Sequence, residues 1–439
     1  MKRIVILGGA ESGVGTAILA QKQGYDVFVS DMGNIEDRYK QILLAHDVRW
    51  EEGQHTETEI LRADEVVKSP GIPDNAPMIQ RLIAHGTPIL SELEFAKRYS
   101  RGHTICISGS NGKTTTTSLI YYIMQRSGMD VGLAGNIGRS FAMQVAEEDH
   151  DWYVLEVSSF QLDNMFDFKA DIAVLMNITP DHLDRYNFEM QNYTDSKMRL
   201  IQNQTPQDYF IYWRQDDHIE EELRKRRKGY RPQPTPSSRP VRSGDPTLCG
   251  FEDNDFERLE LNFSQIGQHN KRNALAAYHA TKLAGVDEGL IRQCLSEFPG
   301  VEHRLERVAE KNGVLYINDS KATNVDACNV ALQAMSRPTI LIVGGRDKGN
   351  DYSTIAELVK EKCTALVYLG ADNQKLHDSF DTLGLPIADT HSMKDCIEAC
   401  THMAKTGDVV LLSPCCASFD LFKNMEDRGE QFKQFVRAL

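Results

Sequence analysis

Residues 109–115 read Gly-Ser-Asn-Gly-Lys-Thr-Thr, directly after a short apolar run and directly before a segment with helical spacing. A strand, a glycine loop and a helix in this order are the setting in which backbone N–H groups converge on phosphate oxygens. Lys113 would add a positive charge to such a site, and the Thr114 hydroxyl could hold Mg²⁺. The stretch therefore predicts a nucleoside triphosphate site in an α/β domain. Its glycines are separated by two residues rather than the usual four, which argues against the commonest ATPases and GTPases.

The composition predicts a multidomain globular enzyme. The chain has 439 residues, more than one hydrophobic core usually supports, and 41% of them are hydrophobic. Its formal charge of −14 opposes nonspecific binding to nucleic acid or anionic lipid. The nine cysteines fit neither a disulfide framework nor a zinc site, and no apolar run reaches the ~20 residues of a membrane span. We therefore expect a cytoplasmic protein that binds neither nucleic acid nor a membrane.

The order of apolar runs and helical segments predicts three α/β domains, over residues 1–100, 101–300 and 301–439. The first opens with a strand, a glycine loop, a helix and a second strand, which is a Rossmann-like start. Ala10 stands where a dinucleotide-binding loop has its second glycine, which argues against hydride transfer with NAD. We expect the central domain to be P-loop ATPase-like and the third to be a second Rossmann-like domain.

Polar residues follow the apolar runs of the two later domains, where each predicted strand ends. In the central domain they are residues 156–161 and 177–184, and in the third they are residues 318–324 and 344–348. The carboxyl ends of parallel strands meet at one edge of a sheet, where open α/β sheets bind ligands. We therefore expect these residues to form ligand sites.

Residues 216–246 depart from this pattern, because a basic run is followed by a proline-rich stretch. This composition predicts an exposed loop. A nucleic-acid patch is the alternative, and the acidic charge of the chain argues against it.

Several blocks of sequence together resemble the Mur ligases, from one end of the chain to the other. The short phosphate loop is the form that this family shares with folylpolyglutamate synthetases. The other matching blocks are residues 135–138, 156–161, 181–185, 267–270, 303–304, 318–324, 412–420 and 422–424. The two C-terminal blocks are similar to the family member that adds D-glutamate.

The resemblance implies ATP-dependent formation of an amide between the L-alanine carboxylate of UDP-N-acetylmuramoyl-L-alanine and the amine of D-glutamate. An acyl phosphate would be the intermediate, and its formation needs positioning and charge neutralisation more than a nucleophilic side chain. The implied partners are these small molecules, bound by a monomer that works in peptidoglycan synthesis. The alternatives are another Mur ligase, a folylpolyglutamate-synthetase-like ligase, or a nucleotide-switched binding protein, although the sequence lacks the guanine-selecting Asn-Lys-x-Asp motif.

The resemblance also implies the residues of each site. The ATP site would be Gly109, Ser110, Asn111, Gly112, Lys113, Thr114, Thr115, Asn270, Asn273, Arg304 and Asp319. The D-glutamate site would be Lys321, Thr323, Lys348, Ser418 and Phe419. The UDP-substrate site would be Ser12, Gly13, Asp31, Ser69, Gly71, Asn136, Ser158 and His182. The catalytic residues would be Lys113, Glu156, His182, Lys197 and Arg304.

A first and a second Mg²⁺ ion are implied, held by Thr114, Glu156, His182 and Lys197, the last as a carbamate. Bound CO₂ would turn the lysine amine into a carboxylate, and a lysine whose pKa is lowered is able to react. From the residues alone, His182 is equally a structural histidine, because hard cations prefer oxygen. Without the resemblance, the sequence predicts that Lys197 is an ordinary helix lysine that faces the solvent.

The chain departs from the family pattern at two places. Met425 stands where an aromatic residue is often found, so the packing of the D-glutamate site is open at that position. The stretch Asp31-Met-Gly lacks the Thr-Arg pair that some members use on the uridine phosphates. The contacts of the UDP moiety are therefore the least specified part of the resemblance.

Overall fold

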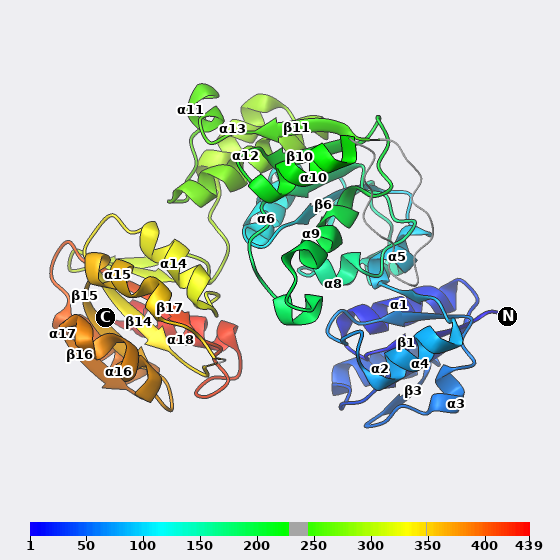
Figure 1. Cartoon of the computed structure of the whole chain (residues 1–439), viewed down its shortest axis with the longest axis horizontal. Helices are drawn as coiled ribbons and strands as arrows, with labels where there is room; N and C mark the ends of the chain where they lie inside the picture. The colour runs from blue at the N-terminus through cyan, green and yellow to red at the C-terminus, as the bar shows by residue number, and fades with distance from the viewer. Residues whose placement is uncertain (228–244, 348) are drawn as a thin grey trace. The chain divides into compact units, whose positions relative to one another are not determined.

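A computed structural model describes residues 1–227, 245–347 and 349–439 (Figure 1). Three sheets, each flanked by helices, confirm the predicted α/β fold. The chain forms two compact units. The first holds residues 1–263 and 271–298 with two of the sheets, and the second holds residues 264–270 and 299–439 with the third. No helix among the described residues has the length and apolar character that a membrane crossing requires.

The first sheet has five parallel strands in the order β3-β2-β1-β4-β5. Its strands are β1 (Arg3–Leu7), β2 (Asp26–Asp31), β3 (Arg49–Glu52), β4 (Glu65–Lys68) and β5 (Ile89–Leu90). Its helices are α1 (Glu11–Lys22), α2 (Asp37–Ala45), α3 (Glu57–Ile60), α4 (Pro77–His85) and α5 (Glu92–Lys97). The strand order reverses between β1 and β4, and the loops that follow these two strands diverge there, as at the ligand crevice of open α/β sheets.

The second sheet has six parallel strands in the order β11-β10-β9-β6-β8-β7. Its strands are β6 (His103–Ser108), β7 (Val131–Gly135), β8 (Trp152–Glu156), β9 (Ile172–Leu175), β10 (Tyr209–Trp213) and β11 (Thr247–Phe251). The helices around it are α6 (Lys113–Arg126), α7 (Phe141–Glu147), α8 (Ser159–Leu162), η1 (Leu183–Tyr186), α9 (Met190–Met198), η2 (Arg199–Ile201), α10 (Asp217–Arg227), α11 (Asp255–Arg258), α12 (Gln268–Leu283) and α13 (Glu288–Glu297). Its buried residues form one hydrophobic cluster with residues of the first sheet.

Helix α10 corrects the prediction that residues 216–246 form an exposed loop. Ile219 and Leu223 are one helical turn apart and both are buried, so this apolar pair holds the helix against the domain. Arg226, part of the basic run, is also buried and donates to the carbonyl oxygen of Met198 at 3.0 Å. Residues 228–244 lie outside the described residues.

The third sheet has six strands in the order β12-β13-β17-β14-β15-β16, and only the β12–β13 pair is antiparallel. Its strands are β12 (Glu306–Lys311), β13 (Val314–Asn318), β14 (Thr339–Gly344), β15 (Cys363–Leu369), β16 (Ile387–Thr390) and β17 (Val409–Cys415). Its helices are α14 (Val325–Gln333), α15 (Ser353–Lys362), α16 (Gln374–Phe380), η3 (Asp381–Leu383), α17 (Met393–Met403) and α18 (Met425–Ala438). The central strands β13, β14 and β17 are fully buried, which explains their continuous apolar sequences.

Candidate active site

The phosphate loop joins β6 to α6, as its sequence predicts. Gly109 has a φ of +145° and Gly112 a φ of +87°, both in the region that favours glycine. A Cβ atom at Gly112 would lie 2.6 Å from Oδ1 of Asn273. The glycines are therefore required by backbone conformation, and at Gly112 also by space. Because α6 begins directly after the loop, its first N–H groups face the place where a phosphate would bind.

A neighbouring loop, residues 177–179 after β9, fixes the shape of the phosphate loop. The backbone N–H of Asn111 donates to Oδ1 of Asn177 at 2.8 Å, and Nδ2 of Asn177 donates to the carbonyl oxygen of Asn111 at 3.0 Å. Oγ of Ser110 donates to the carbonyl oxygen of Thr179 at 2.8 Å and accepts from its N–H at 2.9 Å. The two strand-end loops thus form one hydrogen-bonded edge.

Lys113 curls back over the loop that precedes it. Its Nζ donates to the carbonyl oxygens of Gly109 at 2.7 Å and Ser110 at 2.9 Å. A phosphate oxygen is a stronger acceptor than a carbonyl because charge-assisted hydrogen bonds are the stronger kind. The ammonium group therefore lies where it can exchange these carbonyl partners for the phosphate oxygens of a bound triphosphate.

Glu156 ends β8 and is buried. Its Oε1 accepts from Nδ2 of Asn136 at 2.9 Å, whereas its Oε2 is buried and has no hydrogen-bond partner among the described residues. Asn136, predicted to contact the UDP-substrate, is thus placed against this carboxylate. Ser158, predicted for the same site, caps the N-terminus of α8 in a capping box with Gln161.

Lys197 is only 1% exposed, so its interpretation as a solvent-facing lysine is wrong. Burial lowers its pKa well below the ordinary value, and the charge of Lys113 lowers it further. Its Nζ lies 4.6 Å from the centre of the Tyr193 ring, and the Tyr193 hydroxyl lies 3.1 Å from Oγ of Ser110 in the phosphate loop. A buried amine with a lowered pKa therefore lies beside the phosphate loop.

Sequence reasoning gave no role to Tyr193, although it precedes Lys197 by four residues and so lies on the same face of α9. That spacing is the signal that could have identified it.

His182 is not a buried structural histidine, since its side chain is 55% exposed. It has a φ of +51° and precedes η1, and its ring meets the Phe160 ring edge-on with centroids 5.2 Å apart. Its Nε2 lies 3.6 Å from a carboxylate oxygen of Asp181. The histidine is thus accessible to a ligand.

The donor set beside the loop fits Mg²⁺. Glu156 offers a buried carboxylate oxygen that has no hydrogen-bond partner among the residues the structure describes, and Thr114 offers a hydroxyl at the start of α6. In the described part of the chain, no three His, Cys, Asp or Glu side chains are grouped to hold a metal. Mg²⁺ does not need such a group, because it keeps several waters and shares the phosphate oxygens of its nucleotide.

A cavity of about 740 Å³ opens at the carboxyl edge of the first sheet. Three residues predicted for the UDP-substrate line it, Asp31, Ser69 and Gly71, and most of the other lining residues are apolar. Two predicted residues, Ser12 and Gly13, lie in the first turn of α1 and are not among the lining residues.

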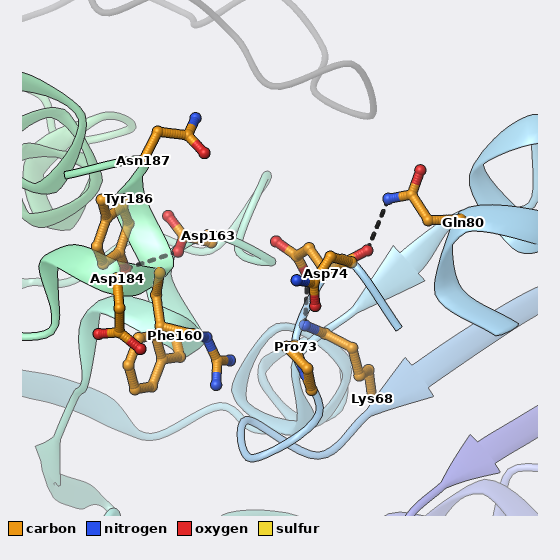
Figure 2. Close-up of a pocket in the computed structure, with 11 residues that line it drawn as sticks. Lys68, Pro73, Asp74, Gln80, Phe160, Asp163, Asp184, Tyr186 and Asn187 are labelled. Carbon is orange, nitrogen blue, oxygen red and sulfur yellow. Dashed lines mark hydrogen bonds and ion pairs between the residues drawn. The ribbon is translucent and has the colours of Figure 1, made fainter. Parts of the chain in front are cut away.

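A second, more polar cavity of about 320 Å³ shares Pro73, in the loop that follows β4, with the first cavity. Figure 2 shows Lys68, Asp74 and Gln80 on one side of it and Asp163 and Tyr186 on the other. Nζ of Lys68 donates to the carbonyl oxygen of Ile72 at 2.9 Å and pairs with Asp74. This buried lysine therefore ties down the loop that carries Ser69 and Gly71.

In the second unit, Arg304 and Asp319 lie close together. Burial raises the pKa of Asp319 to about 7, and the charge of Arg304 opposes the rise. The Asp319 carboxylate accepts from Oγ of Ser413 at 2.9 Å and from the N–H of Leu305 at 3.2 Å. Nε of Arg304 is buried and has no hydrogen-bond partner among the described residues. Asn270, also predicted for ATP, is buried and donates to the carbonyl oxygen of Ile266 at 2.7 Å.

Four of the residues predicted for D-glutamate, Lys321, Thr323, Ser418 and Phe419, come from the segments that follow β13 and β17. The N–H of Thr323 donates to the carbonyl oxygen of Lys321 at 2.9 Å. Ser418 is buried, Phe419 is 64% exposed, and Lys348 lies outside the described residues.

Arg428 of α18 holds these two loops together and was missed from the sequence. Its buried guanidinium donates to the carbonyl oxygens of Ser320 at 2.9 Å and Cys416 at 3.1 Å. Oγ of Ser320 in turn donates to the carbonyl oxygen of Met425 at 2.8 Å. Residue 425 thus contacts Ser320 through its backbone carbonyl oxygen, and this hydrogen bond does not depend on the side chain at that position.

Models of three protein-family domains match segments of the chain that contribute to the three sheets. Residues 3–78 match the MurD N-terminal domain, residues 107–281 the Mur ligase middle domain, and residues 303–416 the Mur ligase glutamate ligase domain. A relative from Bacteroides fragilis, named UDP-N-acetylmuramoylalanine–D-glutamate ligase, is 59% identical over 100% of both chains. Relatives of the same name from Bacteroides thetaiotaomicron and Porphyromonas gingivalis are 57% identical over 100% of both chains and 49% identical over 99% and 98%.

Solved structures share the fold at low identity. UDP-N-acetylmuramate-alanine ligase MurC from Thermotoga maritima aligns with a TM-score of 0.59 and 16% identity over 100% of both chains. Folylpolyglutamate synthase from Mycobacterium tuberculosis, solved with ADP, aligns with a TM-score of 0.57 and 14% identity over 77% of this chain and 91% of that one.

Proposed function

The chain belongs to the Mur ligase family, and on this premise we propose that it joins D-glutamate to UDP-N-acetylmuramoyl-L-alanine at the expense of ATP. The observation that carries the proposal is the 59% identity, over the whole of both chains, to a relative named for that reaction. Another Mur ligase or a folate-extending ligase has less support, because relatives at 48% to 59% identity carry the D-glutamate name. The step belongs to peptidoglycan precursor synthesis, which we expect in the cytoplasm, carried out by a monomer.

The reaction needs activation because a carboxylate does not react with an amine. Transfer of the γ-phosphoryl group of ATP to the L-alanine carboxylate would form an acyl phosphate and release ADP. The amine of D-glutamate would then attack the carbonyl carbon and release phosphate. Phosphoryl transfer needs positioning and charge neutralisation, for which Lys113 and the first N–H groups of α6 are suited.

Mg²⁺, when bound, would neutralise charge on the transferring phosphoryl group. Thr114 and Glu156 would hold it, with His182 as a further ligand at the exposed side. We propose that Lys197 takes up CO₂ as a carbamate, since its amine is buried and its pKa lowered. The resulting carboxylate would add the hard oxygen donors that Mg²⁺ prefers.

The remaining substrate groups are assigned to separate loops. The cavity with Asp31, Ser69 and Gly71 is proposed for the UDP moiety, with Ser12, Gly13, Asn136 and Ser158 as further candidates. The loops with Lys321, Thr323, Ser418 and Phe419 are proposed for D-glutamate, together with Lys348. Asn270, Asn273, Arg304 and Asp319 are proposed for ATP.

Phosphate release by the purified chain tests the proposal. With ATP, Mg²⁺ and UDP-N-acetylmuramoyl-L-alanine present, release should begin only when D-glutamate is added. L-Lysine and meso-diaminopimelate, each added instead, serve as matched controls. Stimulation by either of these in place of D-glutamate would overturn the assignment of the amino acid.

A further inference from the structure

The cavity at the carboxyl edge of the first sheet is nearly devoid of positive charge. Among the described residues that line it, Arg81 of α4 is the only lysine or arginine. The rest of the lining is largely apolar, with Met32, Ile72 and Met78 among its members. The diphosphate of a UDP-linked substrate carries negative charge, and the chain as a whole has a formal charge of −14. A diphosphate bound in this cavity therefore needs a positively charged group to balance its negative charge.

The glycine loop after β1 offers fewer backbone N–H groups to a phosphate than dinucleotide-binding loops usually do. The N–H of Gly9, which would face a phosphate in a dinucleotide-binding loop, instead donates to Oδ2 of Asp31 at 2.6 Å. The other oxygen of Asp31 accepts from the N–H of Gly33 at 2.7 Å. The carboxylate thus fixes the loop and leaves a negative charge at the cavity.

The histidine of the cavity does not supply the missing charge. Burial lowers the pKa of His55, whose Nδ1 lies 2.6 Å from Oγ of Ser30, and so favours the uncharged imidazole. The guanidinium group of an arginine, in contrast, carries a positive charge as a rule.

Arg81 is at present paired with Glu57, the first residue of α3. The two side chains are 54% and 42% exposed, and an ion pair with this exposure contributes little to stability. A diphosphate can therefore replace Glu57 as the partner of the guanidinium at small cost. Arginine is the side chain best suited to such an exchange, since its planar fork binds phosphate oxygens with two hydrogen bonds.

We propose that Arg81 is the cationic contact for the UDP moiety of the substrate, and that Glu57 competes with the nucleotide for it. The inference rests on the proposed function, which supplies the UDP-linked substrate. It makes Arg81 a determinant of substrate affinity, and Glu57 a residue that weakens binding.

The test is the binding of UDP alone to the full chain, measured by titration calorimetry. Arg81→Met should weaken UDP binding about tenfold or more, because it removes a charge-assisted contact. Glu57→Gln should tighten it, since the guanidinium is then free. Arg62→Met is the matched control, because Arg62 is an exposed arginine paired with Glu59 and does not line the cavity. It should bind UDP as the wild type does.

Arg81→Met that binds UDP within twofold of the wild type would overturn the inference, and so would Glu57→Gln that binds more weakly. If Arg81→Met does not fold, Glu57→Gln alone decides through the direction of its effect. A wild-type chain that fails to bind UDP would also overturn it, whereas release of phosphate that depends on D-glutamate would still support the proposed function.

Discussion

Glu92→Gln is expected to remove a large pH dependence from the stability of the first unit. Glu92 of α5 is buried, and its carboxylate accepts from Oγ of Ser140 and from the N–H of Ala142 at 3.0 Å, at the start of α7. Burial raises its pKa from 4.5 to about 7, although both hydrogen bonds favour the ionised form. The carboxyl group thus links α5 to the start of α7, and because folding raises its pKa it is more easily ionised in the unfolded chain.

The sign and size of the effect follow from this shift. Because the folded pKa is the higher one, the stabilising contribution is complete below pH 4.5 and is lost as the pH rises through about 7. A difference of roughly 2.5 pKa units corresponds to about 3 kcal/mol in total. About 2 kcal/mol of it falls between about pH 5.5 and about pH 8.5, because the unfolded carboxyl is already largely ionised at the lower value.

Urea denaturation at these two pH values measures the effect. The wild type should lose about 2 kcal/mol more unfolding free energy than Glu92→Gln as the pH rises. Glu148→Gln is the control, since this glutamate is exposed and should leave the pH dependence unchanged. Equal losses in the wild type and Glu92→Gln would refute the reasoning.

Two further predictions concern the site around the phosphate loop. Lys197→Ala should abolish ligase activity, and a small carboxylate such as acetate should restore part of it. Lys394→Ala, at an exposed lysine, is the control and should leave activity unchanged. Full activity of Lys197→Ala without acetate would refute the carbamate. Gly112→Ala should weaken ATP binding at least tenfold in a titration, because its Cβ atom would lie 2.6 Å from Oδ1 of Asn273 and its φ is +87°. Wild-type affinity in Gly112→Ala would show that the loop relaxes freely.

The parts of the fold that could be predicted are those with a local signal. Strand β6, the phosphate loop and α6 are adjacent in sequence, and the glycines at positions 109 and 112 are required by local backbone conformation. The buried strands of the third sheet are continuous apolar runs, because helices cover both faces. The family resemblance, carried by short blocks of this kind, is confirmed by the full-length relatives.

The features that could not be predicted depend on contacts between distant segments. Lys197 has the sequence of an ordinary helix lysine, and its burial depends on how α9 packs beside the phosphate loop. Arg428 lies on a helix far along the chain from Ser320, which it contacts. Arg81 is the single lysine or arginine among the described residues that line the first cavity, and it reaches this position because α4 packs near the loops that follow β1, β2, β3 and β4. The periodicity of apolar residues in the sequence does not predict contacts between such distant segments.

The most direct test of the account is the fate of the substrate carboxylate oxygens. The L-alanine carboxylate of UDP-N-acetylmuramoyl-L-alanine is labelled with ¹⁸O, and the phosphate released on addition of D-glutamate is analysed by mass spectrometry. Attack of the carboxylate on the γ-phosphorus of ATP predicts that each phosphate carries one oxygen from the carboxylate. Unlabelled phosphate would contradict activation through an acyl phosphate.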